Sequence, residues 1–311
     1  MKRLFLIALL VACERSGSGP KGSGALAPED KQLFALLPAN STGVFGGNYM
    51  KLQQFMTTTL GKTTAAILDK VGPGMIEWSK CFTEKPIRLA GSGNVVGKGF
   101  EMRMVFTGLT IDGIGACAAR AKFKSTVDPD GKFIAVELPP PTGSQGYLQT
   151  STGALYNRQM MVISAAPTVI PTTRADLETD LKAAAANSVV QDDKLVTLIG
   201  KADRGKTMWF VASGANTPIA DKLGEMIATA DLEKGLALDL WVQLLNSGDA
   251  DKLEEGIGEM KKMSAALPGS LKTAVESIKF AHKGDRVHLS IELDDEQLAD
   301  VMQQASLLSQ H

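Results

Sequence analysis

Residues 236–244 read LALDLWVQL, with an apolar side chain at every second position. A similar alternation runs from Phe100 to Thr107, in FEMRMVFT. Successive side chains of a β-strand point to opposite faces of a sheet, so a period of two over eight or nine residues predicts strands with one buried face. These two segments therefore predict a sheet made largely of antiparallel strands.

The same order of elements occurs twice along the chain, with these two strands at matching places. A short helix at Asp30–Leu37 precedes a strand at Val44, and a helix at Asp193–Ile199 precedes a strand at Thr207–Val211. Further helices are expected in matching pairs, at about 51–71 and 217–229, 112–124 and 249–266, and 173–186 and 294–308. The expected strand pairs are Lys132–Leu138 with Gln159–Ala165, and Ile278–His282 with Val287–Leu293.

This order predicts an α+β fold made of two tandem repeats, at residues 29–190 and 191–311. Each repeat is expected to form a mixed, mostly antiparallel sheet with helices packed on one face, which is the simplest layered arrangement of such elements. The 311 residues are too many for one average domain but suit a duplicated unit.

The N-terminus carries an export signal. Two basic residues precede the nine-residue apolar run Leu4–Ala12, which is too short to cross a bilayer as a helix but suits a secretory signal. The run ends in Leu10-Val11-Ala12-Cys13, which resembles the lipobox of bacterial lipoproteins. That resemblance implies a signal peptide at residues 1–12, cleavage before Cys13 and lipid attached to Cys13. The alternative is an ordinary secretory signal with a chance cysteine.

Residues 13–28 are expected to form a flexible tether after the lipid anchor, because Glu14–Gly24 is rich in Gly and Ser and has no apolar side chain. The membrane, contacted through lipid on Cys13, is therefore one expected partner, and an envelope protein is another. The expected location is the cell envelope, at the outer membrane, although Glu14 does not decide between the inner and outer membranes.

Composition and motifs argue against nucleic acid and nucleotide partners. The net charge is −1 and aromatic residues make up 5% of the chain, so neither a basic surface nor a stacking platform is expected. Gly200–Thr207 fits the pattern of a phosphate-binding loop, but a helix is expected before it and a strand after it, the reverse of what that site needs. Gly91–Gly97 has the wrong spacing for a dinucleotide loop and favours a glycine-rich hairpin. No cofactor is expected.

The sequence also favours a protein that is not an enzyme, with no catalytic residue and no metal site. Of the three histidines, His282 and His288 fall in a tight hairpin around Gly284-Asp285 that would point them to opposite faces of the sheet. The alternative is a three-residue turn, which would realign them and allow a metal site. No H-E-x-x-H, C-x-x-C or G-x-S-x-G motif occurs.

Cys81 and Cys117 are the two cysteines left in an exported chain once Cys13 carries lipid. Their even number in an oxidising compartment favours a disulfide that closes a loop of about 36 residues. The alternative is a pair of buried free thiols.

A long insertion in the first repeat, at residues 139–153, replaces the short turn of the second repeat. Loops of this length are often functional, so Gln145, Tyr147 and Gln149 are candidates for contacting a partner. The alternative is a lengthened hairpin with no role in binding.

Beyond the anchor, the chain resembles uncharacterised secreted lipoproteins of myxobacteria, through Leu36-Leu37-Pro38-Ala39, the two cysteines and Leu289–Leu298. That resemblance implies no known activity. The leading hypothesis is a lipid-anchored envelope protein that acts as a non-enzymatic binding or scaffold module. The alternatives are a periplasmic carrier of an apolar ligand and a hydrolase of unknown specificity.

Overall fold

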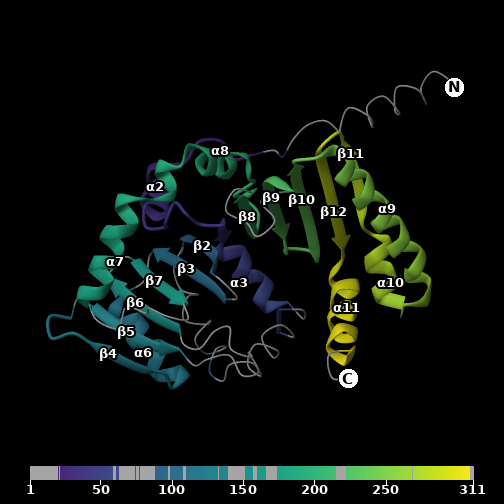
Figure 1. The fold of residues 1–311 in the computed structure, drawn as a ribbon. Helices are drawn as coiled ribbons and strands as arrows, with labels where there is room; N and C mark the ends of the chain where they lie inside the picture. The colour runs from purple at the N-terminus through teal and green to yellow at the C-terminus, as the bar shows by residue number, and fades with distance from the viewer. Residues whose placement is uncertain are drawn as a thin grey trace.

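The structure is a computed structural model that describes residues 20, 22–58, 61–62, 74, 77, 88–96, 99–107, 110–131, 133–138, 151–156, 160–165, 174–214, 222–267 and 269–308. Within these residues, the strands form one twelve-stranded sheet in which every pair of neighbours is antiparallel (Figure 1). The predicted α+β class, with an antiparallel sheet, is therefore confirmed. No described helix is long and apolar enough to cross a bilayer.

The strands are β1 (Gly43–Asn48), β2 (Arg88–Val96), β3 (Gly99–Thr107), β4 (Lys124–Val127), β5 (Phe133–Leu138), β6 (Ser151–Tyr156), β7 (Met160–Ala165), β8 (Met208–Ser213), β9 (Leu223–Asp231), β10 (Leu236–Leu244), β11 (Lys279–Lys283) and β12 (Arg286–Leu293). The α-helices are α2 (Pro28–Phe34), α3 (Tyr49–Thr57), α6 (Ile111–Ala121), α7 (Arg174–Ala186), α8 (Asp193–Lys201), α9 (Ser247–Met263), α10 (Gly269–Glu276) and α11 (Asp295–Leu308). Two short 3₁₀-helices are η2 (Val189–Gln191) and η4 (Ser264–Ala266).

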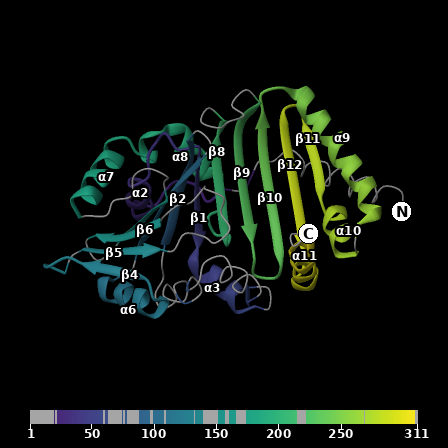
Figure 2. The ribbon, with the colours of Figure 1, turned by 60° about the horizontal axis from the view of Figure 1, so that its bottom comes forward.

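The strand order is the same on both sides of the central pair β1 and β8. Outward from β1 the sheet continues β2-β3-β7-β6, and β5 and β4 then extend this first half (Figure 1). Outward from β8 it continues β9-β10-β12-β11 (Figure 2). The helices α2 and α8 begin at residues 28 and 193 and the strands β1 and β8 at residues 43 and 208, a constant offset of 165. This order supports two repeats, and duplication of the sequence stays a prediction. The two halves share one continuous sheet, and the expected boundary between residues 190 and 191 falls inside η2.

Two expected elements differ in the structure. β5 pairs with β4 and β6 and not with β7, because β6 occupies the end of the expected insertion and takes the place beside β7. The helix expected at 217–229 is wrong, since Leu223–Asp231 is the strand β9. Its Ala, Met and Glu content favours a helix, but pairing with β8 on one side and β10 on the other overrides that preference.

Helices cover both faces of the sheet, which corrects the expectation of helices on one face. The central strand β1 is apolar on both sides: Val44 packs among residues of α2 and α8, whereas Phe45 points to the opposite face. On that opposite face α6 packs against Ile134 and Val136, and α3, α9 and α11 cover the second half of the sheet. The outer strands are apolar on one side only, so their sequence pattern does not indicate helices on a second face.

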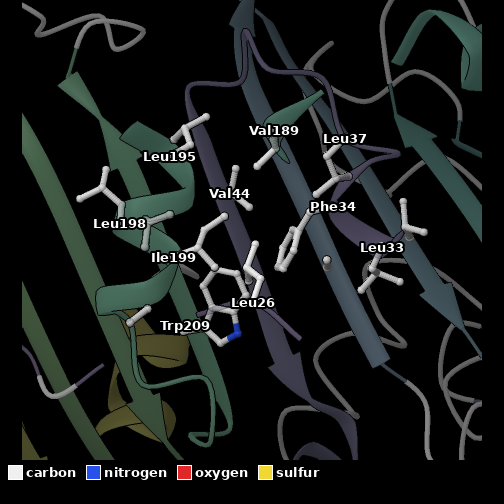
Figure 3. Close-up of a cluster of buried hydrophobic side chains, with 14 of the residues drawn as sticks. Leu26, Leu33, Phe34, Leu37, Val44, Val189, Leu195, Leu198, Ile199 and Trp209 are labelled. Carbon is white, nitrogen blue, oxygen red and sulfur yellow. The ribbon is translucent and has the colours of Figure 1, made fainter. Parts of the chain in front are cut away.

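The largest cluster of buried side chains lies between α2, α8 and the centre of the sheet (Figure 3). Leu33 and Phe34 of α2, Leu198 of α8 and Val44 of β1 belong to this cluster. The Phe34 ring meets Trp209 of β8 edge-on, with ring centroids 5.8 Å apart. Because the cluster draws on both halves of the chain, it joins them into one hydrophobic core.

The folded part of the chain starts earlier than residue 29, so the last residues of the segment expected to be a tether belong to the fold. Leu26 is buried in the main core, and the Arg204 guanidinium donates hydrogen bonds to the carbonyl oxygens of Gly24 and Ala25. Arg204 also forms an ion pair with Asp30 at 3.1 Å. The Gly- and Ser-rich composition that indicates a flexible tether does not reveal these contacts, which depend on a residue far along the chain.

Candidate functional site

The second half of the sheet has a cleft on the same face as α8. α8 lies over β8 and β9, and beyond it the face of β10, β12 and β11 forms a cleft of about 480 Å³. The lining residues are Pro20, Lys201, Glu225, Ile227, Trp241, Val242, Gln243, Ala281, His282, Lys283, Asp285, Arg286, Val287 and His288. Eight of these fourteen residues are polar or charged, so the cleft offers charged and hydrogen-bonding groups as well as apolar surface.

Two stacked rings stand in the cleft. Trp241 of β10 and His288 of β12 face each other across the two strands, with ring centroids 3.8 Å apart and an angle of 9° between the rings. The His288 Nε2 lies 3.0 Å from the Asp239 carboxylate, which lies two residues before Trp241 on the same face. On β11 the residue opposite His288 is Ala281, whose small side chain leaves room beside the imidazole. The carboxylate and the indole thus fix the orientation of the imidazole.

Charged and polar groups lie in the row of residues next to this stack, toward the β11–β12 turn. Glu225 of β9 lies opposite Gln243 of β10 and forms an ion pair with Lys201 at 3.2 Å. The Gln243 amide donates to Asp285 at 2.6 Å and accepts from the Arg286 Nε at 3.2 Å. Gln243 thereby holds the β11–β12 turn against β10, and the turn itself uses Gly284 at φ +62°, a conformation that favours glycine.

These groups can bind a polar ligand. The Asp239–His288 pair resembles the base and orienting carboxylate of a catalytic triad, but a triad also needs a nucleophile hydrogen-bonded to the imidazole. Among the described residues, no serine, threonine or cysteine is hydrogen-bonded to His288. Rings, an amide and charged groups gathered in one cleft are what recognition of a polar ligand requires.

The two described histidines lie on opposite faces of the sheet, as the tight hairpin predicts. His282 pairs with Val287 and points toward α9, where its Nε2 lies 3.0 Å from Glu254 and 3.5 Å from Asp251. His288 points into the cleft. Within the part of the chain that the structure describes, no group of three or more His, Cys, Asp or Glu side chains is placed to hold a metal ion.

The phosphate-loop pattern at Gly200–Thr207 lies between α8 and β8, in the order predicted from the sequence. The loop therefore follows the C-terminus of a helix, whose dipole repels a phosphate. The two side chains that would hold phosphate and magnesium are already engaged: Lys206 donates to Asp231 at 3.2 Å, and the buried Thr207 hydroxyl donates to Asp231 at 3.1 Å.

Asp231 is the centre of an ion-pair network between the two halves. Lys51 of α3 lies 3.7 Å from Asp231 and 2.9 Å from Glu233. Burial raises the pKa of the Asp231 carboxyl, but hydrogen bonds from Lys206 and Thr207 and the charge of Lys51 outweigh burial and lower that pKa overall. A carboxylate with a lowered pKa stabilises the fold above its ordinary pKa, and this contribution is lost as the pH falls through the lowered value.

The remaining predicted site residues lie largely outside the described residues. These are the lipidation site Cys13, Cys81 and the loop residues Gln145, Tyr147 and Gln149. Cys117 is described: it is buried on α6, and the Arg120 Nη2 lies 3.3 Å from its sulfur. The disulfide between Cys81 and Cys117 therefore stays a prediction, as do lipid attachment and a role for the loop in binding.

Sequence reasoning did not find the cleft. The alternation in 236–244 assigns Asp239, Trp241 and Gln243 to the less apolar face of a strand, and that is where they lie. What no local pattern shows is that β12 lies beside β10 and sets His288 opposite Trp241. An aromatic ring on the polar face of an otherwise regular strand is the one signal that could have raised this possibility.

Comparisons with known proteins leave the function open. No family model and no curated protein matches the chain. A solved structure described as "Structure of crystal form IV of TP0453" aligns with a TM-score of 0.40 and 9% sequence identity, over 86% of this chain and 95% of that chain. A likeness of this degree carries no argument about what this chain does.

Proposed function

We propose that the protein is a lipid-anchored envelope protein that acts as a non-enzymatic binding module, with the cleft over β10, β12 and β11 as its binding surface. The observation that carries this proposal is the stack of Trp241 on His288 inside a polar, charged cleft. Buried ring surface supplies affinity, and the oriented Asp239 and Gln243 groups supply selectivity for a polar partner.

The first experiment tests the anchor. Replacing the sulfur nucleophile in Cys13→Ser should abolish incorporation of labelled fatty acid and leave the signal uncleaved. The measurement is metabolic labelling followed by membrane fractionation. The matched control is Glu14→Gln, which changes the next residue and keeps the thiol, so labelling should persist. Labelled fatty acid on the Cys13→Ser chain would show that the lipobox interpretation is wrong.

The second experiment tests the cleft as a binding surface in the cell. A photo-cross-linking amino acid in place of Lys201, which is 46% exposed at the rim of the cleft, should give a specific adduct with an envelope component. The same amino acid in place of Lys252, which is 75% exposed on α9, should not. Equal adducts from both positions, or none from Lys201, would contradict a binding role for the cleft.

A further inference from the structure

The cleft contains two cations that form no ion pair with a carboxylate among the described residues. Lys283 and Arg286 flank the two-residue turn between β11 and β12 and face each other directly across the two strands. Like charges in this relation destabilise an antiparallel pair. Neither side chain forms an ion pair with a carboxylate in the described part of the chain. Asp285 lies between them in the turn, so two cations there face one carboxylate, whose Oδ2 accepts from Gln243.

The acidic groups of the cleft are all engaged elsewhere. Glu225 is paired with Lys201 at 3.2 Å, and Asp285 accepts the Gln243 amide at 2.6 Å. Asp239, next to the lining, lies 3.0 Å from His288. Glu225 is offset by Lys201, whereas Asp285 keeps its negative charge because its partner is a neutral amide. At the turn, Lys283 and Arg286 outnumber this one carboxylate, so the charge there is positive, beside the open side of the imidazole. An anion with two or more acceptor oxygens would satisfy both cations.

The start of the folded chain limits where this anion can come from. Pro20 lines the cleft, and Cys13 precedes it by seven residues. Seven residues of fully extended chain span at most about 24 Å. If Cys13 carries lipid, as the proposed function holds, the cleft cannot lie farther than this from the membrane that holds the anchor. Phosphate-bearing headgroups are then the most concentrated anions within its reach.

We propose that the cleft binds the phosphate of an anionic lipid headgroup, with the Lys283 ammonium and the Arg286 guanidinium as its ligands. The Gln243 amide holds the Arg286 Nε and so leaves the outer guanidinium nitrogens to meet the phosphate oxygens. The His288 ring, backed by Trp241, forms the wall against which the rest of the headgroup lies. This assignment rests on the proposed function only for the source of the phosphate.

The test uses the mature chain, residues 13–311, with Cys13→Ser, so that neither an acyl chain nor the apolar segment Leu4–Ala12 contributes to binding. Its affinity is measured for phosphatidylcholine vesicles with and without phosphatidylglycerol, and for inorganic phosphate alone. We expect binding to the anionic vesicles, and we expect phosphate to compete with it. Lys283→Gln with Arg286→Gln should weaken vesicle binding by about thirtyfold.

The matched control is Lys252→Gln with Lys262→Gln, which removes the same charge from α9, on the opposite face of the sheet. An equal loss of affinity in this control would overturn the site, because the binding would then follow net charge alone. Saturable binding of inorganic phosphate without binding to anionic vesicles would overturn the headgroup assignment. No binding of either probe would overturn the proposal while leaving the lipid anchor, tested by labelling of Cys13, unaffected.

Discussion

Replacing Leu198 by alanine should lower the free energy of unfolding by about 3 kcal/mol. Leu198 lies on α8, and its side chain is fully buried in the cluster that joins the two halves of the sheet. Its removal therefore leaves a cavity that the neighbouring strands cannot close. The measurement is urea unfolding of the full chain, followed by tryptophan fluorescence, because Trp209 lies in the same cluster.

Leu253→Ala is the matched control for this prediction. Leu253 also lies in a helix, α9, but its side chain is 45% exposed. The change in helix propensity is the same for both variants, so the difference between them reports burial alone. The control should change the free energy of unfolding by less than about 0.5 kcal/mol. A Leu198→Ala variant as stable as this control would mean that α8 does not form the core described above.

The sheet could be predicted from the sequence because strand periodicity is a local property. The alternation in 236–244 and the β11–β12 hairpin around Gly284 both appear in the structure as expected. The segment Leu223–Asp231 could not be assigned in this way, since its residues favour a helix in isolation. Only the unsatisfied edges of β8 and β10, one on either side, make it a strand.

The candidate site could not be predicted for a related reason. Lys283 and Arg286 are neighbours across a predicted turn, and their proximity follows from the sequence. The position of Trp241 beside His288 does not, because it depends on β12 lying next to β10 across the intervening α9 and α10. The position of Pro20 in the cleft likewise depends on Arg204, which holds Gly24 and Ala25, the residues that follow it, through their carbonyl oxygens.

Gly91 shows why a glycine-rich segment can be the middle of a sheet. It lies in β2 directly opposite Phe45 of β1, and the Phe45 ring covers it. A Cβ atom at residue 91 would lie 2.1 Å from the nearest ring carbon, closer than atoms pack. The glycines of Gly91–Gly97 that suggest a ligand loop thus include one that makes room for an aromatic side chain on the neighbouring strand.

Gly91→Ala should therefore lower the free energy of unfolding by about 1–3 kcal/mol, because the ring must leave its place to admit the methyl group. The same substitution at Gly258, in α9, meets no atom within 4 Å and should raise the free energy of unfolding by about 0.5–1 kcal/mol, since alanine favours the helix. Urea unfolding of both variants measures these two changes in the free energy of unfolding, which should have opposite signs. In a Phe45→Leu variant, Gly91→Ala should lower the free energy of unfolding by less, because the ring that obstructs the methyl group is gone. If Gly91→Ala lowers the free energy of unfolding by the same amount in the Phe45→Leu variant, the destabilisation comes from the backbone of β2 and not from contact with Phe45.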